Sequence, residues 1–286
     1  MSSRPDAAPV LAGHGLTVAY EKRVVVEDLD IAVEAGTVTA IIGPNGSGKS
    51  TLLRTLARLM RPRAGTVLLD GDDIRSRPTR AVARRLGLLP QSPNVPDQLT
   101  VEELVRRGRY PHRSWWQQWS RADEQAVAQA MDLAAVADLA ARPVDELSGG
   151  QRQRVWIATA LAQDAEIMLL DEPTTFLDLA HRLEVLDLVG TLHRDHGRTI
   201  VLVLHDLADA ARVADRLVAV ADGTVVAEGR PEEVLTPALV EAVFGVQAMV
   251  LPDPYTGRPV VLPAPRGWQE PDVAPAAEPV APGTRP

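Results

Sequence analysis

The sequence predicts an α/β fold in which a nucleotide-binding core carries an N-terminal antiparallel β subdomain and an inserted helical subdomain. Three observations lead to this prediction. Residues 39–53 have the pattern of a strand, a glycine-rich turn and a helix. Strands and helices alternate again from residue 167 onward, as they do around a parallel sheet. The stretch between them, about 92–145, shows mainly helical periodicity, which indicates an inserted helical subdomain.

Length and composition limit the possible classes of protein. The chain has 286 residues, enough for one large α/β domain with an inserted lobe or for two modest domains. It contains no cysteine, which excludes disulfides, thiolate catalysis and zinc–thiolate sites. The formal net charge of −8 does not indicate the basic face that a nucleic-acid partner favours.

Neither a signal peptide nor a membrane span is evident in the sequence. The first 15 residues lack the apolar core of a signal peptide, and no run approaches the roughly 18 apolar residues of a membrane span. We therefore expect a cytosolic protein, or one that is attached to a membrane only through its partners.

Local patterns predict the individual elements. Two short β-type runs, 16–20 and 23–26, flank Glu21 and Lys22 and predict a hairpin. Residues 1–9 and the Pro/Ala-rich segment 263–286 are predicted to be disordered, so the folded domain is expected to span 10–262. We expect further strands at 31–33, 38–42, 65–71, 86–89, 167–170, 199–204, 217–221 and 224–227, and helices at 52–60, 101–105, 123–141 and 179–193.

Residues 43–50, with the sequence GPNGSGKS, match the G-x-x-x-x-G-K-[ST] register of a phosphate-binding loop. Its three glycines allow backbone N–H groups to surround an anion at the positive end of the following helix. Lys49 would reach the β- and γ-phosphates, and the Ser50 hydroxyl would bind Mg²⁺. Only two lysines, Lys22 and Lys49, occur among 30 basic residues, so a lysine at this position fits a site that needs a compact ammonium. The flanking strand and helix favour a nucleoside triphosphate site over a turn that matches the motif by chance.

Two adjacent acidic residues follow the apolar run 167–170. Asp171 would hold Mg²⁺, largely through water, and Glu172 would polarise the attacking water as a general base. An Asp-Glu pair after a strand could also cap the next helix, but beside a phosphate loop it favours catalysis. His205 and Gln91 also follow apolar strands, and from this pattern alone each has a simpler structural interpretation.

A second anion cradle is predicted at residues 147–151, with the sequence LSGGQ. It reads as a helix N-terminus with a serine cap and no Cβ at two positions. One chain therefore carries two cradles about a hundred residues apart, although a single ATP does not obviously need both. With these motifs the chain resembles the ATP-binding subunit of ABC transporters over about residues 10–262. The motifs that carry the resemblance are residues 43–51, Gln91, 147–151, 167–172, Leu177-Asp178 and His205.

The resemblance implies a head-to-tail homodimer with each ATP held between the two subunits. Tyr20 would stack on adenine, Asp178 would lie at the dimer seam, and His205 would contact the γ-phosphate. Gln91 would sense the metal and the water and would link to the membrane partner. The resemblance assigns catalysis to Lys49, Glu172 and His205, and Mg²⁺ to Ser50, Gln91 and Asp171. It assigns the ATP of the same subunit to Gly43, Pro44, Asn45, Gly46, Ser47, Gly48, Lys49, Ser50 and Thr51, and the opposite ATP to Ser148, Gly149, Gly150 and Gln151.

Finer similarity points to a subfamily. Residues 108–112, 171–178, 204–207 and 251–254 look like those of iron-siderophore importer ATPases, notably the ferric-enterobactin type. This resemblance implies an ATP-hydrolysing subunit that energises import from the cytoplasmic face of the membrane, bound to permease subunits and indirectly to a substrate-binding protein.

Three alternative functions remain open. ATPases of haem and vitamin B12 importers are closely related. A soluble ABC ATPase that acts on ribosomes or DNA is disfavoured by the single domain, the short lobe and the negative charge. An exporter ATPase is disfavoured by the importer-like motifs and the absence of a fused membrane domain.

The aromatic cluster at 110–119 either packs within the helical lobe or docks on the membrane subunit. The nearby basic residues Arg106, Arg107, Arg109 and Arg113 indicate a solvated face rather than a lipid-binding patch, because the net charge is negative and no amphipathic anchor is present.

Overall fold

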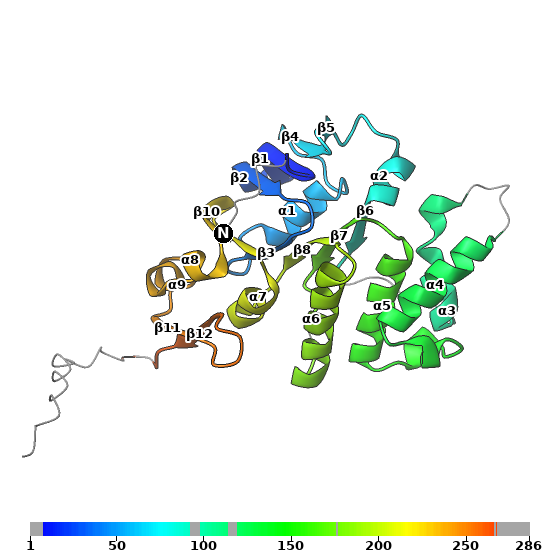
Figure 1. Ribbon diagram of the computed structural model, residues 1–286. Helices are drawn as coiled ribbons and strands as arrows, with labels where there is room; N and C mark the ends of the chain where they lie inside the picture. The colour runs from blue at the N-terminus through cyan, green and yellow to red at the C-terminus, as the bar shows by residue number, and fades with distance from the viewer. Residues whose placement is uncertain (1–7, 92–97, 114–118, 176, 266, 268–286) are drawn as a thin grey trace, which may run out of the picture.

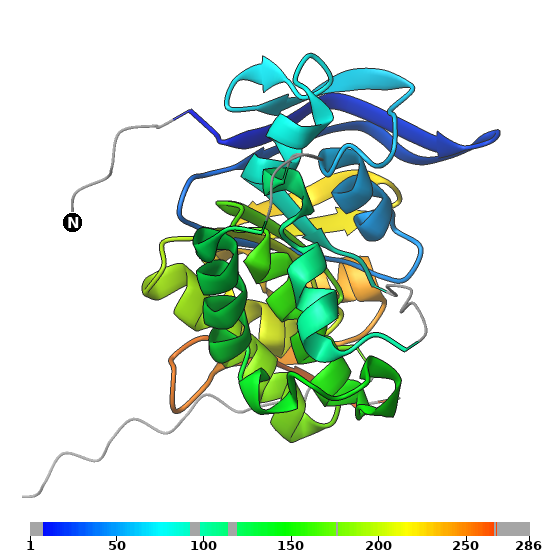
Figure 2. The same cartoon turned by 90° about the vertical axis from the view of Figure 1, so that its right-hand side faces the viewer.

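The computed structural model describes residues 8–91, 98–113, 119–175, 177–265 and 267. Figures 1 and 2 show three layers: an antiparallel sheet, a central sheet with α1 (Lys49–Leu56) between the two, and a set of helices on the far side of the central sheet. This arrangement confirms the predicted α/β fold with an N-terminal antiparallel β subdomain.

The antiparallel sheet has the strand order β2-β1-β4-β5. Its strands are β1 (Leu11–Tyr20), β2 (Arg23–Val33), β4 (Ala64–Leu69) and the short β5 (Asp72–Asp73). Tyr20 pairs with Arg23 across the turn at Glu21 and Lys22, so the predicted hairpin is confirmed, with longer strands than expected.

The central sheet has the order β10-β9-β3-β8-β7-β6. Five strands are parallel, and β10 runs antiparallel to β9. Every residue of β3, β7 and β8 is buried, because both faces of the sheet are covered. The strands are β3 (Val38–Ile42), β6 (Leu86–Leu89), β7 (Ile167–Asp171), β8 (Thr199–Val203), β9 (Arg216–Ala221) and β10 (Thr224–Gly229).

Two hydrophobic cores lie on the two faces of this sheet. Ile41 of β3 packs with side chains of α1 and the antiparallel sheet. Its neighbours Ala40 and Ile42 belong to the other core, which includes side chains of α5 (Gly149–Ala162), α6 (Leu179–Arg194) and α7 (Leu207–Val213). The alternation of side chains along each strand therefore holds the three layers together.

The remaining described elements flank these layers. Along the chain, α2 (Thr79–Arg85) connects β5 of the antiparallel sheet to β6 of the central sheet. The region of the predicted helical insertion contains α3 (Val101–Arg107), η1 (Tyr110–His112), α4 (Arg121–Leu133), η2 (Ala137–Leu139) and η3 (Val144–Glu146). The chain continues through α8 (Pro231–Val234), α9 (Pro237–Phe244) and a hairpin of β11 (Ala248–Pro252) and β12 (Pro259–Pro263).

Two predicted helices have the wrong bounds. The helix expected at 52–60 is α1, which starts at Lys49 and ends at Leu56 because Arg58 has a left-handed backbone with φ 61°. The helix expected at 123–141 is α4, which ends at Leu133 because Ala135 has φ 51°. The elements α2, α7 and the β11–β12 hairpin were not predicted from the sequence.

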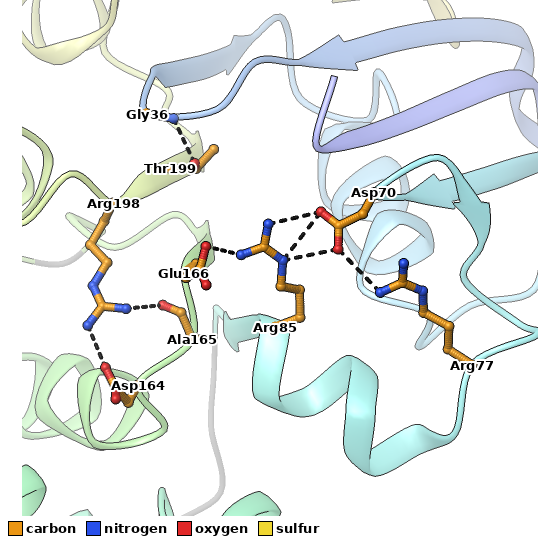
Figure 3. A network of polar contacts seen from close by, with 9 residues as sticks. All are labelled: Gly36, Asp70, Arg77, Arg85, Asp164, Ala165, Glu166, Arg198 and Thr199. Atoms are coloured by element: carbon orange, nitrogen blue, oxygen red, sulfur yellow. Dashed lines mark hydrogen bonds and ion pairs between the residues drawn. The ribbon is translucent and has the colours of Figure 1, made fainter. Parts of the chain in front are cut away.

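Arginine side chains tie the antiparallel sheet to the core at the amino-terminal end of β7 (Figure 3). Arg85 at the end of α2 donates to both oxygens of Asp70, which follows β4, at 2.9 to 3.3 Å, and also pairs with Glu166. Arg77 pairs with Asp70 as well, at 3.2 Å. This network lies at the end of β7 opposite to Asp171.

Several predictions concern residues outside the described ones. Residues 1–7, 266 and 268–286, which form most of the predicted disordered ends, are among them, as are 114–118 of the aromatic cluster and 92–97 of the predicted insertion. The domain boundaries therefore stay predictions. Within the described ranges, none of the helices has the length and apolar character needed to cross a membrane.

Candidate active site

Four adjacent strands deliver one group of the predicted site residues to one edge of the central sheet. The order β3-β8-β7-β6 places the phosphate loop, His205, Glu172 and Gln91 beyond neighbouring carboxyl ends. Ligands of open α/β sheets bind at this edge, beyond the carboxyl ends of the strands. The sheet therefore brings together residues that are far apart in the sequence.

The carboxylate of Glu172 is the meeting point of these segments. Gln91 Nε2 donates to Glu172 Oε2 at 2.6 Å, and His205 Nε2 lies 2.6 Å from Glu172 Oε1. Thr175 Oγ1 also donates to Oε2, at 3.1 Å. Glu172 has a left-handed backbone with φ 53°, and its side chain is only 8% exposed. Both carboxylate oxygens are thus held by side chains from different loops, which fixes the direction in which this base would point.

At two positions of the phosphate loop, the backbone conformation and the close neighbours allow only glycine. Gly43 has φ 150°, and a Cβ added there would lie 2.0 Å from the Val220 carbonyl oxygen. Gly48 has φ 101°, and a Cβ there would lie 2.8 Å from the Val25 carbonyl oxygen. The buried Ser47 hydroxyl has no hydrogen-bond partner among the described atoms. These features fit a loop that wraps an anion with backbone and hydroxyl donors.

Lys49 folds back over this loop. Its Nζ donates to the carbonyl oxygens of Gly43 at 2.9 Å and of Pro44 at 2.8 Å. Burial lowers the pKa of Lys49, while the nearby carboxylates of Glu172 and Asp171 act in the opposite direction. The ammonium is therefore held at the centre of the site, close to both acidic residues.

Ser50 and Asp171 form the oxygen-rich part of the site. Ser50 Oγ donates to Asp171 Oδ1 at 2.7 Å. Asp171 Oδ2 is buried without a hydrogen-bond partner among the described atoms, and Arg54 Nε lies 3.8 Å away. Burial raises the pKa of Asp171. Mg²⁺ prefers oxygen ligands such as hydroxyl and carboxylate oxygens. Ser50 and the Asp171 carboxylate, one oxygen of which has no described hydrogen bond, therefore fit that ion.

The predicted second cradle is built as a helix cap. Ser148 Oγ accepts from Gln151 N at 3.3 Å, and Gln151 Oε1 accepts from Ser148 N at 3.1 Å, a complete capping box at the start of α5. Asp178 caps α6 and accepts from His181 N at 3.0 Å. The described residues show no hydrogen bond or ion pair between either of these helix starts and the phosphate loop. The predicted site residues therefore fall into two groups within one chain.

Tyr20 has no described hydrogen bond to the Glu172 cluster. It ends β1, and 47% of it is exposed. None of the hydrogen bonds described for the chain connects the Tyr20 side chain to the phosphate loop.

Comparisons with known proteins agree with this geometry. A sequence profile of the family described as ABC transporter matches residues 26–175. The achromobactin transport ATP-binding protein of Dickeya dadantii is 53% identical over 248 residues, covering 87% of this chain and 92% of that protein. The ferric enterobactin transport ATP-binding protein of Escherichia coli is 50% identical over 253 residues, covering 88% and 93%. The chain belongs to the ABC transporter family of ATP-binding proteins.

Two further comparisons extend this result. The cobalamin import ATP-binding protein of Halobacterium salinarum is 43% identical over 251 residues, covering 88% of this chain and 63% of that protein. A solved dimeric ATP-binding cassette in a post-hydrolysis state, bound to ADP and Pi, matches with a TM-score of 0.69 at 28% identity, covering 77% of this chain and 98% of that one. The predictions of an ABC-type fold and of an ABC-type ATPase are confirmed.

Sequence reasoning missed three residues of this ABC ATPase site. Thr175 contacts Glu172, and Arg54 is the cation beside Asp171. The third, Arg182, contacts the residue that follows His205. Thr175 lies three residues after Glu172, so a turn after the strand could have indicated it. The Arg54 contact depends on how α1 packs beside the end of β7, and the Arg182 contact on how α6 packs beside the start of α7, so no local pattern signals either of them.

Proposed function

We propose that this ABC ATPase is the ATP-hydrolysing subunit that energises import of an iron-siderophore complex across the cytoplasmic membrane. The observation that carries the catalytic part is the contact of both Gln91 and His205 with the Glu172 carboxylate. Glu172 is the general base that takes a proton from the attacking water. His205 and Gln91 hold its carboxylate in place, and His205 also reaches the γ-phosphate.

The phosphate loop and its neighbours bind the triphosphate. The Lys49 ammonium exchanges its contacts with the carbonyl oxygens of Gly43 and Pro44 for contacts with phosphate oxygens, which are stronger acceptors because they are charged. Ser50, Gln91 and, largely through water, Asp171 would hold Mg²⁺. When bound, this ion neutralises negative charge on the β- and γ-phosphates.

The two separate groups of site residues support a head-to-tail homodimer. In such a pair, residues 148–151 and Asp178 of one copy reach the ATP held by the phosphate loop of the other. In this arrangement the second cradle of each copy binds the ATP that is held by the phosphate loop of the other copy. The dimeric state of the matched ATP-binding cassette supports this proposal. Tyr20, exposed at the end of β1, is the candidate to stack on the adenine.

The transport partners follow from the same proposal. The ATPase binds membrane-spanning permease subunits through its helical subdomain, at about 92–145, and so lies peripherally on the cytoplasmic face of the membrane. A substrate-binding protein takes part indirectly through the permease, and no nucleic acid is involved. In this proposal, residues 10–262 form the ATP-binding domain.

The names of the relatives support the cargo. Those at 50% and 53% identity are named for ferric enterobactin and achromobactin transport, whereas the relative named for cobalamin import is 43% identical. We therefore place an iron-siderophore ahead of haem or vitamin B12. A soluble ABC ATPase that acts on ribosomes or DNA is less favoured.

Uptake by cells that lack the gene tests the cargo directly. Deletion is expected to abolish uptake of radiolabelled iron-siderophore, and the wild-type chain is expected to restore it while Glu172→Gln is not. Parallel assays with labelled haem and cobalamin are expected to show no change. Loss of cobalamin or haem uptake with intact siderophore uptake would contradict the proposed cargo but not the ATPase assignment.

A further inference from the structure

The first turn of α6 makes contacts to two parts of the site. Asp178 caps this helix, and the backbone N–H of Arg182 donates to the Asp178 carbonyl oxygen at 2.9 Å. The Arg182 side chain reaches the start of α7 and is 29% exposed. Arg182 thus lies one helical turn from a residue that we place at the dimer seam.

Arg182 holds two carboxylates at the start of α7. Its Nη2 lies 2.5 Å from Asp206 Oδ2, and its Nε donates to Asp209 Oδ2. The other oxygen of Asp206 caps α7 and accepts from the N–H groups of Ala208 at 2.9 Å and Asp209 at 3.1 Å. Asp206 is therefore fixed on both sides, by the helix that it caps and by Arg182.

The two carboxylates that Arg182 contacts differ in their burial and charge environment. The Asp209 side chain is only 9% exposed, and burial raises its pKa although Arg182 acts in the opposite direction. Burial also acts to raise the pKa of Asp206, but hydrogen bonds from the Asp209 backbone and from Arg182 lower it overall. Removing the Arg182 charge would leave Asp206 and Asp209 close together without either of these contacts, with Arg212 as the remaining cation that acts on Asp209. Such a pair of partly buried carboxylates is costly, so the start of α7 would be expected to shift.

Asp206 follows His205 directly in the chain, and His205 contacts Glu172. A shift of Asp206 is therefore passed through one peptide unit to the imidazole on the Glu172 carboxylate. We propose that Arg182 is a positioning residue for hydrolysis, which couples the Asp178 end of α6 to His205 and Glu172. This inference rests on the proposed roles of Glu172 and His205 in ATP hydrolysis.

A matched pair of variants tests this inference in the full-length chain. Arg182→Gln keeps most of the side-chain length and removes the charge, whereas Arg182→Lys keeps the charge. Arg212→Gln is the control for loss of a nearby positive charge without loss of the direct contacts, because Arg212 of α7 pairs with Asp187 of α6 at 3.7 Å and acts on Asp209 only through its charge. We expect Arg182→Gln to lower kcat for ATP about tenfold or more while KM changes less than about twofold. Arg182→Lys should recover a large part of kcat, and Arg212→Gln should retain wild-type kinetics.

A double-mutant cycle with His205→Ala separates positioning from a merely structural role. If Arg182 acts through His205, adding Arg182→Gln to His205→Ala should lower kcat by less than about twofold, measured by single-turnover phosphate release. A wild-type kcat for Arg182→Gln would overturn the inference. The inference would also fail if Arg212→Gln lowered kcat as much as Arg182→Gln does, or if the effects of Arg182→Gln and His205→Ala on kcat were fully additive. A wild-type chain without any ATP hydrolysis would overturn the proposed function as well, so the two failures are distinguishable.

Discussion

Glu172 and His205 follow different strands, yet His205 Nε2 lies 2.6 Å from Glu172 Oε1. The contact exists because β7 and β8 are neighbours and both end at the same edge of the sheet. Because Gln91 occupies the other oxygen of the carboxylate, little rotational freedom remains at Glu172. The proposed base is therefore oriented by side chains of its own chain.

Replacing Glu172 by Gln is expected to separate binding from hydrolysis. Glutamine has the same shape but cannot accept a proton from water, so kcat should fall by about 10²–10⁴-fold. ATP binding should persist, and the variant should dimerise with ATP and Mg²⁺, as measured by phosphate release and by size-exclusion light scattering. Glu166→Gln, at the opposite end of β7 and with a side chain that is 72% exposed, is the control and should keep wild-type turnover. Wild-type hydrolysis by Glu172→Gln would contradict the base assignment, and a monomer at every concentration would contradict the dimer.

The two lysines of the chain provide a second matched test. Lys49→Ala removes the buried ammonium from the phosphate loop, whereas Lys22→Ala changes an exposed residue in the β1–β2 turn. Hydrogen bonds to charged groups contribute about 1.5–3 kcal/mol, so ATP affinity of Lys49→Ala should fall about 10- to 100-fold. Lys22→Ala should bind ATP as the wild type does. Isothermal titration calorimetry with ATP measures the affinity of both variants. An unchanged affinity of Lys49→Ala would contradict the phosphate-loop interpretation.

The sequence indicates the components of the site better than it indicates their contacts. Glycines at fixed spacing and polar residues after apolar strands mark the phosphate loop, Asp171 and Glu172 without any tertiary information. The meeting of Gln91, Glu172 and His205 depends on the strand order β8-β7-β6, which no local pattern specifies. The C-terminal ends predicted for α1 and α4 were wrong for a related reason. Arg58 and Ala135 adopt left-handed backbones that only the packing around them selects.

The two glycines of the second cradle should differ in their effect on stability. A Cβ at Gly150 would lie 2.5 Å from His181 Cδ2 and 3.1 Å from its Cβ, whereas a Cβ at Gly149 would meet no atom within 4 Å. Gly150→Ala should therefore lower the free energy of unfolding by about 1–3 kcal/mol through overpacking. Gly149→Ala should be neutral or stabilising by up to about 1 kcal/mol, because alanine favours a helix. Urea unfolding without nucleotide measures both, and equal stability of the two variants would refute this packing argument.

The Arg85–Asp70 pair should make stability depend on pH in a defined direction. A hydrogen bond from Arg85 lowers the pKa of Asp70 below its usual value of 3.8. A carboxylate with a lowered pKa in the folded state contributes stability above its unfolded pKa, and this contribution is lost as the pH falls through the folded value. Arg85→Gln should therefore reduce the free energy of unfolding by about 1–2 kcal/mol at pH 7, since both side chains remain partly solvated.

Below about pH 4 the difference between wild type and Arg85→Gln should shrink, because Asp70 becomes protonated in the unfolded chain and then in the folded one. Urea unfolding at pH 7, 4 and 3 follows this change. Arg80→Gln serves as the control, since Arg80 lies exposed on the same helix, and no ion pair is described for it among the residues of the structure. Its stability should match the wild type at each pH. A difference for Arg85→Gln that stays constant or grows toward acid would show that the Asp70 carboxylate is not its partner in solution.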